Sequence, residues 1–324
     1  MTKIKIGIVG YGNLGRGIET ALTNSSDMEL FAIFTRRDPL TLASTSRVES
    51  YDSLINFKNE IDVLILAGGS QKDIPEQGPE LAANFNTVDC FDTHPAIADY
   101  FAEMNRIALK YKHVSTIAIG WDPGLFSLQR MLSEAILPAG ETYTFWGEGL
   151  SQGHSDAVRR VPGVKHGVQY TIPDQAMISD IKAGKTVNYT SAKAHKRVVY
   201  VVVEPDADQK EIANQIKNMP DYFAPYQTEV HFISQAEFLE NHQGMPHGGT
   251  VIRQGETSPG TKAVFEFNLK LESNPQYTAA ISVAFARATY KLYNVEQYGA
   301  KTIFDIPLGL LSNRDSEDLL HNII

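Results

Sequence analysis

The sequence predicts an α/β fold, with a doubly wound parallel sheet followed by a second domain of the α+β class. Two observations support this. Over roughly the first 120 residues, short apolar runs alternate with longer segments of helical spacing, which is typical of parallel strands joined by right-handed crossover helices. Beyond Trp121, alternating and aromatic segments follow one another without regular helices, which indicates a mixed or antiparallel sheet.

The first part contains five expected strands. The run Ile61–Ala67 is almost purely apolar, as suits a strand that helices cover on both faces. The strands are expected at Ile4–Val9, Glu29–Phe34, Ile61–Ala67, Thr87–Cys90 and His113–Ile119, and the helices at Asn13–Asn24, Pro75–Phe85 and Ile97–Tyr111.

The second part is expected to hold five strands and two helices, and a long helix follows it. We expect the segment that begins with the helix Tyr277–Leu292 to pack back on the first domain. The domains are therefore expected at 1–120, completed by 277–324, and at 121–276, the second binding substrate. The strands are Thr142–Trp146, Lys193–Glu204, Thr228–Ile233, Gly249–Gln254 and Lys262–Leu271, and the helices are Gln175–Ala183 and Ala207–Asn218.

Charge and composition exclude several function classes. The chain has 29 Lys+Arg against 38 Asp+Glu, a net charge of −9, and no basic tract, which argues against nucleic acid as a partner. No apolar run approaches the ~18–20 residues of a membrane span, and the N-terminus lacks signal-peptide character, so a cytoplasmic protein is expected. The single cysteine, Cys90, excludes a disulfide framework. His154, His242 and His247 lack zinc-ligand spacing, so no metal is expected.

A glycine-rich segment follows the first strand and opens a helix. In this context Gly10 permits a tight turn, Gly12 lets the backbone approach a pyrophosphate, and Gly15 allows close packing of helix and strand. The helix N-terminus then presents free N–H groups to the anion. The segment predicts a Rossmann-type dinucleotide site formed by Gly10, Tyr11, Gly12, Asn13, Leu14 and Gly15.

The end of the second strand selects the dinucleotide. A site for NAD places Asp or Glu there for the ribose 2′-hydroxyl, whereas this chain has Thr35, Arg36 and Arg37. Guanidinium groups pair with a 2′-phosphate, so NADP(H) is the expected cofactor. After the third strand, the small residues Gly68, Gly69 and Ser70 leave room for the cofactor.

Polar residues concentrate in a few further segments. Asp92 and Asp122 follow expected strands, so they should lie at the carboxyl edge of the sheet near the nicotinamide, where a carboxylate can hold a cationic amine. Thr171, Arg197 and His247 belong to the second domain and are suited to hold a carboxylate. Together these segments predict a zwitterionic substrate.

These segments resemble the meso-diaminopimelate D-dehydrogenases, over essentially the whole chain. SQGHSDAVRR (Ser151–Arg160) and GMPHGG (Gly244–Gly249) are more specific than the glycine motif, because generic dinucleotide domains lack them. The other matching segments are GIVGYGNLG, the T-R-R after the second strand, DIPEQGP, GWDPG, FWGEGL, HKR, MPDYF and LKLESNP.

The resemblance implies a homodimer that oxidises the D-centre of meso-2,6-diaminopimelate with NADP. The products are L-2-amino-6-oxopimelate and ammonia, and the reverse reaction serves lysine and peptidoglycan-precursor synthesis. Thr171, Arg197, His247 and Asn274 would bind the distal L-centre, and Asp92 and Asp122 would lie near the reacting amine. Trp121 and Trp146 would shape the pocket, whose floor Gln152, Gly153 and Asp156 would line.

The sequence leaves the proton acceptor open. Hydride leaves the α-carbon only when its amine is neutral, and Asp92, Asp122 or His154 could take the proton. His154 is a candidate shuttle because the ordinary histidine pKa lies near neutrality.

Two alternatives predict different features. A dihydrodipicolinate reductase-like or sugar dehydrogenase-like enzyme would carry a lysine where this chain reads Asp92-Thr-His94-Pro95. A regulator that binds NADPH without turnover would lack the density of polar residues expected at the sheet edge.

Overall fold

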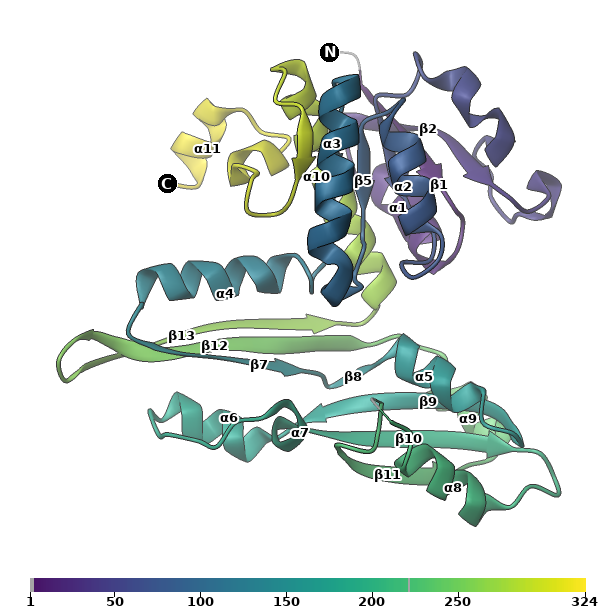
Figure 1. Cartoon of the computed structure of the whole chain (residues 1–324), viewed down its shortest axis with the longest axis vertical. Helices are drawn as coiled ribbons and strands as arrows, with labels where there is room; N and C mark the ends of the chain where they lie inside the picture. The colour runs from purple at the N-terminus through teal and green to yellow at the C-terminus, as the bar shows by residue number, and fades with distance from the viewer. Residues whose placement is uncertain (1–2, 221) are drawn as a thin grey trace. The chain divides into compact units, whose positions relative to one another are not determined.

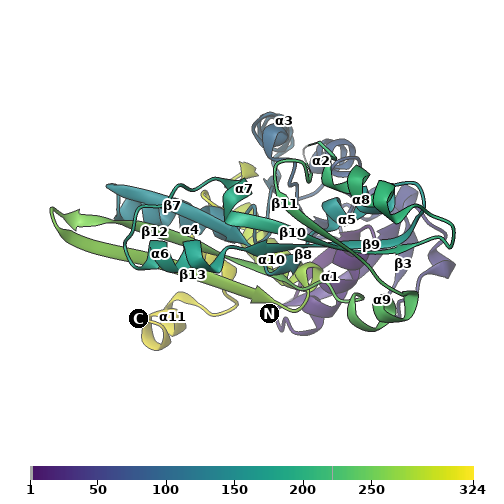
Figure 2. The same cartoon turned by 90° about the horizontal axis from the view of Figure 1, so that it is seen from below.

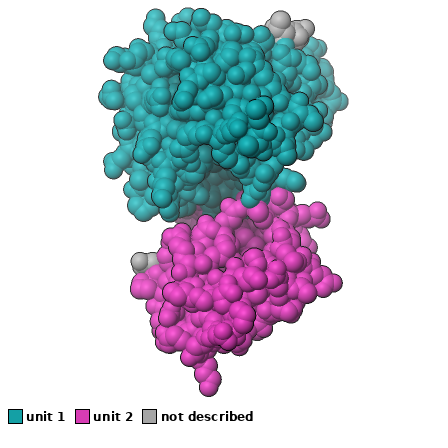
Figure 3. Space-filling view, turned by 90° about the vertical axis from the view of Figure 1, so that its right-hand side faces the viewer, with its two compact units in different colours: residues 1–128, 275–324 teal, residues 129–274 magenta. Residues whose placement is uncertain are grey.

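The computed structural model describes residues 3–220 and 222–324. It divides into two compact units, residues 1–128 with 275–324 and residues 129–274, which Figure 3 colours separately. The limits of the units fall inside α4 (Leu125–Ile136) and at the start of α10 (Asn274–Asn294).

The first unit contains a seven-stranded sheet in which every pairing is parallel, in the order β14-β6-β5-β4-β1-β2-β3. The predicted Rossmann-type fold is confirmed. The strands are β1 (Ile4–Val9), β2 (Met28–Thr35), β3 (Val48–Ser50), β4 (Val63–Leu66), β5 (Thr87–Asp89), β6 (Val114–Thr116) and β14 (Gly299–Lys301), and the α-helices are α1 (Asn13–Thr23), α2 (Ile74–Ala82), α3 (Ile97–Tyr111), α10 and α11 (Ser316–Asn322) (Figure 1).

Sequence periodicity missed both edge strands of this sheet. β3 and β14 have three residues each, too few to show an alternation of side chains. The equally short β5 and β6 were found because they adjoin predicted helices in the alternation of strands and helices. β14 lies near the C-terminus of the chain and pairs with β6. The segment after α10 therefore contributes a strand to the sheet, in addition to packing beside it.

The second unit contains two sheets, as the prediction of a mixed or antiparallel second domain requires. One is four-stranded, β11-β10-β9-β8, with β10 and β11 parallel; the other is three-stranded and antiparallel, β13-β12-β7. Figure 2 shows the long β12–β13 hairpin from below. The strands are β7 (Gly140–Trp146), β8 (Gly149–Leu150), β9 (Val164–Pro173), β10 (His195–Val203), β11 (Gln227–Phe232), β12 (His247–Ser258) and β13 (Thr261–Leu271).

Helices pack against each of these sheets. Ile212 and Ile216 of α8 pack with Val199 and Val201 of β10, and Ile181 of α6 packs with residues of β7 and β12. Both arrangements follow from the alternation of side chains along a strand. The helices of this unit are α5 (Gln152–Arg159), α6 (Gln175–Lys182), α7 (Ser191–Ala194), α8 (Gln209–Lys217) and α9 (Gln235–Asn241).

Several elements after residue 124 were absent from the sequence prediction: α4, β8, α5, β9, α7 and α9. Strand β9 carries Lys165, His166 and Gln169 among its apolar residues, which hides its alternation. Helix α5 coincides with the polar segment that we singled out for its chemistry, and α4 was not predicted. Among the described residues, no helix is both long and apolar enough to cross a bilayer.

Candidate functional site

The glycine loop after β1 has the backbone geometry that its residues predict. Gly10 has φ +94° and donates its N–H to the Phe34 carbonyl oxygen over 2.9 Å. A Cβ on Gly15 would collide with the Gly10 carbonyl oxygen, whereas a Cβ on Gly12 would meet nothing within 4 Å. Because Gly12 immediately precedes α1, the open space beside it leaves the helix N-terminus accessible to an anion.

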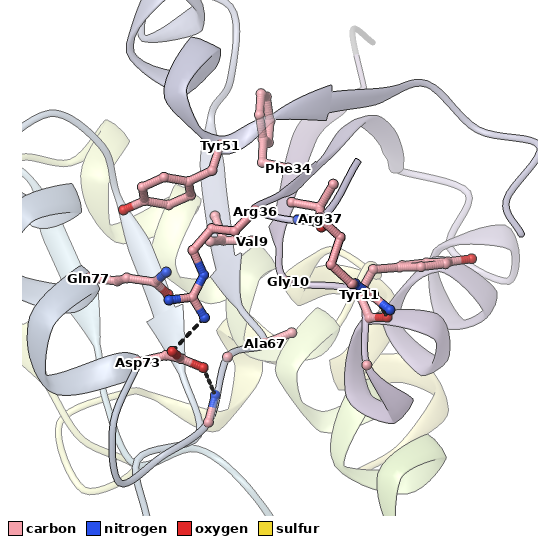
Figure 4. A pocket seen from close by; sticks show the side chains of 14 residues that line it. Val9, Gly10, Tyr11, Phe34, Arg36, Arg37, Tyr51, Ala67, Asp73 and Gln77 are labelled. Atoms are coloured by element: carbon pink, nitrogen blue, oxygen red, sulfur yellow. Dashed lines mark hydrogen bonds and ion pairs between the residues drawn. The ribbon is translucent and has the colours of Figure 1, made fainter. Parts of the chain in front are cut away.

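A pocket of about 350 Å³ opens beside this loop (Figure 4). Its walls come from the glycine loop, the carboxyl ends of β2 and β4, and the first residues of α2, so it lies at the edge where such sheets bind ligands. Of the residues predicted to bind the cofactor, Asn13, Leu14, Gly15 and Ser70 do not line it. The lining residues are Val9, Gly10, Tyr11, Gly12, Phe34, Thr35, Arg36, Arg37, Tyr51, Ala67, Gly68, Gly69, Asp73 and Gln77.

Arg36 is paired with a carboxylate that sequence reasoning did not assign to the site. Its Nη2 lies 2.6 Å from Asp73 Oδ1, and the other oxygen of Asp73 accepts the Gly69 N–H over 2.8 Å, as Figure 4 shows. The Arg36 side chain is 62% exposed. Asp73 belongs to the DIPEQGP segment, and its place directly before α2 was the available signal.

Arg37 is tied to the glycine loop. Its Nη2 donates to the Tyr11 carbonyl oxygen over 2.6 Å, and its backbone N–H donates to Thr35 Oγ1 over 3.1 Å. The Tyr11 hydroxyl contacts Glu19, whose other carboxylate oxygen accepts from Ser44 Oγ over 2.7 Å. Two guanidinium groups thus lie in one pocket with an open helix N-terminus, an arrangement that fits the 2′-phosphate and the pyrophosphate of NADP.

Asp92 and Asp122 follow the carboxyl ends of β5 and β6 in the first unit. The Asp92 backbone N–H donates to Ser70 Oγ over 2.9 Å, and the Asp92 side chain is exposed. Asp122 is half-buried. Trp121 is 7% exposed, and its ring packs edge-on against Phe126 with the centroids 5.2 Å apart.

A buried carboxylate, Asp89, joins the segments that follow β5 and β6. Its Oδ1 accepts the N–H of Phe91 over 3.0 Å and that of Ala118 over 3.2 Å, and its Oδ2 accepts the Tyr100 hydroxyl over 2.8 Å. Burial raises the pKa of Asp89 to about 6 against the lowering effect of these hydrogen bonds. Asp89 therefore connects the backbone that precedes Asp92 with the backbone that precedes Trp121.

In the second unit, β-sheet register brings together residues far apart in sequence. Gly149, Thr171 and Arg197 lie in register across β8, β9 and β10, and a Cβ on Gly149 would collide with His247. The Asn274 backbone N–H donates to the Met245 carbonyl oxygen over 2.9 Å, two residues before His247. We call Thr171, Arg197, His247 and Asn274 the clamp.

Arg197 is 8% exposed and has defined contacts. Its Nη1 donates to Thr171 Oγ1, and its Cζ lies 4.0 Å from the centroid of the Tyr226 ring, a cation–π contact that fixes the guanidinium plane. Its Nε is buried without a hydrogen-bond partner among the described residues. A buried donor of this kind favours an anionic acceptor. Sequence reasoning missed Tyr226, which carries no motif signal of its own.

His154 lies on α5, and the positive charge of Arg197 acts on its imidazole. Its Nδ1 is 2.9 Å from Ser151 Oγ, and the rings of Tyr222 and Phe223 approach it edge-on at 5.3 and 5.6 Å. Burial, with the Arg197 charge, lowers the pKa of His154 to about 4. The ordinary near-neutral histidine pKa therefore does not apply to His154, because the packed rings remove water from the imidazole.

The remaining predicted residues have separate neighbours. The backbone N–H of Trp146 donates to His195 Nε2 over 2.9 Å. Gln152 and Gly153 are exposed at the start of α5, and Gln152 Nε2 lies 3.2 Å from Met245 Sδ. Asp156, also exposed, forms an ion pair with Arg159 one turn further along α5.

Comparison with known proteins identifies the family. Residues 120–273 match the model of the diaminopimelic acid dehydrogenase C-terminal domain. The meso-diaminopimelate D-dehydrogenase of Ureibacillus thermosphaericus is 53% identical over 100% of both chains, and that of Corynebacterium glutamicum is 42% identical over 99% of each. The chain belongs to the meso-diaminopimelate D-dehydrogenase family. The resemblance drawn from the sequence motifs is confirmed.

Solved structures of meso-diaminopimelate D-dehydrogenases have the same fold. The C. glutamicum enzyme in complex with DAP matches with a TM-score of 0.94 at 42% identity, covering 100% of both chains. A multiply substituted meso-DAP dehydrogenase from Clostridium tetani with DAP matches with a TM-score of 0.95 at 50% identity, covering 99% and 100%. An engineered D-amino acid dehydrogenase bound to NADP+ matches with a TM-score of 0.88 at 40% identity over 100% of both chains.

Proposed function

We propose that this chain catalyses the reversible NADP-dependent oxidative deamination of meso-2,6-diaminopimelate at its D-centre, giving L-2-amino-6-oxopimelate and ammonia. The observation that carries the proposal is the buried Arg197 guanidinium. Arg197 lies in register with Thr171, and Gly149, which is also in register with Thr171, lies against His247. A desolvated arginine with an unpartnered Nε suits the carboxylate of a substrate. Meso-2,6-diaminopimelate, the substrate that family membership suggests, has a carboxylate at each end.

The first unit would bind the cofactor, NADP(H). The glycine loop would hold the pyrophosphate at the N-terminus of α1, and Thr35, Arg36 and Arg37 would bind the 2′-phosphate. Gly68, Gly69 and Ser70, after β4, would border the ribose. Bound NADP+ supplies the acceptor for the hydride that leaves the D-carbon.

The clamp would bind the distal L-centre. Arg197 and Thr171 would take its carboxylate, while His247 and Asn274 would complete the contacts to carboxylate and amine. Because the two ends of meso-diaminopimelate differ only in configuration, a clamp that fits the L-end leaves the D-end as the one available for oxidation.

A carboxylate of the first unit would take the proton from the reacting amine. Asp92 and Asp122 are the stronger candidates, since ionised carboxylates also stabilise the iminium cation that forms. With its pKa lowered to about 4, His154 is no stronger a base than an ordinary carboxylate and carries no negative charge to stabilise that cation. Trp121 and Trp146 would shape the pocket, and Gln152, Gly153 and Asp156 would line its floor.

We propose further that the chain acts as a cytoplasmic homodimer, with residues 121–276 binding substrate and forming the interface. Apolar side chains are exposed on α4 and β13 of the second unit: Ile136 is 61% exposed, Val264 43% and Met131 42%. Covering such a surface favours association. Sedimentation of the wild type against Ile136→Lys tests this, because the substitution should shift the protein towards monomer.

The first experiment is NADP+ reduction with meso-, LL- and DD-diaminopimelate supplied separately, the best isomer being repeated with NAD+. Turnover confined to the meso isomer and NADP+ supports both the clamp and the arginine selection of the cofactor. Turnover of the DD isomer as well retains the reaction but contradicts strict recognition of the L-end. Absence of turnover with every isomer contradicts the proposed function.

A further inference from the structure

A buried glutamine outside the residues assigned above contacts the clamp. Gln169 lies on β9 two residues before Thr171, so both side chains occupy the same face of the strand. Its residue exposure is 0%, and its Nε2 is 3.2 Å from Thr171 Oγ1. Its backbone N–H donates to Ser155 Oγ over 2.9 Å, and its carbonyl oxygen accepts the Ser151 N–H over 3.0 Å. The residue is thus fixed between α5 and the clamp.

The hydrogen bonds to Thr171 determine what its hydroxyl can do. Oγ1 accepts one hydrogen bond from Gln169 Nε2 and a second from Arg197 Nη1. Arginine has no acceptor, and the amide NH2 group is a donor. A hydroxyl has two acceptor lone pairs and one proton. With both acceptor positions used, the remaining proton of Thr171 is available only as a donor to a third group.

A carboxylate is the matching third group. When ionised it accepts hydrogen bonds and donates none, and hydrogen bonds to a charged acceptor are stronger than those between neutral groups. Without Gln169, the Thr171 hydroxyl could rotate and its proton would have no fixed direction. The glutamine amide therefore contributes preorganisation, which lowers the cost of ordering the site when substrate binds.

We propose that Gln169 is a positioning residue of the clamp, which orients the Thr171 hydroxyl as a donor to the distal carboxylate of the substrate. The inference rests on the proposed function, because it requires that the clamp bind this carboxylate. Gln169 acts through Thr171 and does not itself touch the reacting atoms.

Two substitutions at Gln169 test the proposal. Gln169→Met retains the length of the side chain without its hydrogen bonds, and we expect the KM for meso-diaminopimelate to rise about tenfold, the equivalent of one hydrogen bond, with kcat changed less than about twofold. Gln169→Glu should raise KM further, because its carboxylate accepts the Thr171 proton and competes for Arg197. The thermal midpoint of each variant verifies that it is folded.

D-Lysine serves as the matched substrate, since it is 2,6-diaminopimelate without the distal carboxylate. Its KM, or its inhibition constant if it binds without turnover, should be the same in the wild type and in Gln169→Met. Gln254→Met is the control variant. Gln254 lies on β12, and its Oε1 is buried without a partner among the described residues. This control should leave the KM for meso-diaminopimelate and the constant measured for D-lysine unchanged.

A double-mutant cycle with Thr171→Val separates positioning from support of the fold. In the Thr171→Val background, Gln169→Met should produce no further rise in KM, because the hydroxyl through which it acts is absent. Additive effects, an equal rise for D-lysine, or an unchanged KM for meso-diaminopimelate would each overturn the inference. Failure of the wild type to oxidise meso-diaminopimelate would instead overturn the proposed function, so the two failures are distinguishable.

Discussion

Two arginines proposed above to bind anions, Arg36 and Arg197, have opposite environments. The Arg36 side chain in the first unit is 62% exposed and forms an ion pair with Asp73. Arg197 in the second unit is 8% exposed, donates to Thr171 and lies against the ring of Tyr226. Both are suited to bind an oxyanion, but only Arg197 is withdrawn from water.

The difference indicates two kinds of recognition. An exposed ion pair contributes at most about 1 kcal/mol and is screened by salt, so Arg36 can exchange Asp73 for another anion at little cost. A buried guanidinium with fixed neighbours loses little freedom on binding and discriminates strongly between ligands that satisfy it and ligands that do not. We therefore expect substitution of the exposed arginine to change cofactor affinity moderately, and substitution of the buried arginine to change substrate use strongly.

The largest effect is expected from Arg197→Met. Removing the buried charge should lower kcat/KM for meso-diaminopimelate by about 100- to 1,000-fold, since truncating one partner of a buried charge pair costs ~2–5 kcal/mol. The effect on D-lysine should stay within about fivefold, and initial rates with both substrates provide the measurement. The control is Lys196→Met, because Lys196 is adjacent on β10 and pairs with Glu229. Equal losses with both substrates would contradict the clamp.

A smaller effect is expected when Arg36 and Arg37 are both replaced by Ser. The KM for NADP+ should rise about 10- to 100-fold through loss of two charge-assisted contacts, while the KM for NAD+ changes less than about threefold. The wild-type KM for NADP+ should also rise with salt. Arg47→Ser is the control, because Arg47 pairs with Glu49 and does not line the pocket. The assignment fails if the two cofactors are affected equally.

The smallest effect is expected from Asp73→Asn. The neutral amide can still accept a hydrogen bond from the Gly69 N–H. It no longer competes with the 2′-phosphate for Arg36, and it no longer repels the 2′-phosphate. The Kd of NADP+, measured by fluorescence titration, should therefore fall about two- to fivefold, with that of NAD+ unchanged. Glu49→Gln, which breaks the exposed pair with Arg47, should alter neither. A weaker affinity for NADP+ would show that Asp73 supports the pocket rather than competing in it.

The cofactor pocket could be predicted from sequence because its parts are contiguous. Gly10 and Gly12 directly follow β1, and Arg36 and Arg37 directly follow β2, so local spacing alone places them at one edge of a parallel sheet. Asp73 was missed as a neighbour of Arg36, since a contact between residues 37 positions apart depends on how α2 begins beside β2.

The sequence by itself determined the doubly wound sheet and the residues of the glycine loop, because periodicity and backbone requirements are local properties. The sequence segments and the family resemblance named the four residues of the clamp, but only the tertiary structure shows how they come together. Thr171 and Arg197 lie in register on β9 and β10, and Gly149 of β8, in register with Thr171, lies against His247. Strand β9 was not visible in the sequence. The low pKa of His154 and the contact of Gln169 with Thr171 were likewise decided by the tertiary structure. Desolvation and hydrogen-bond direction depend on neighbours that folding brings together, and no spacing along the chain encodes them.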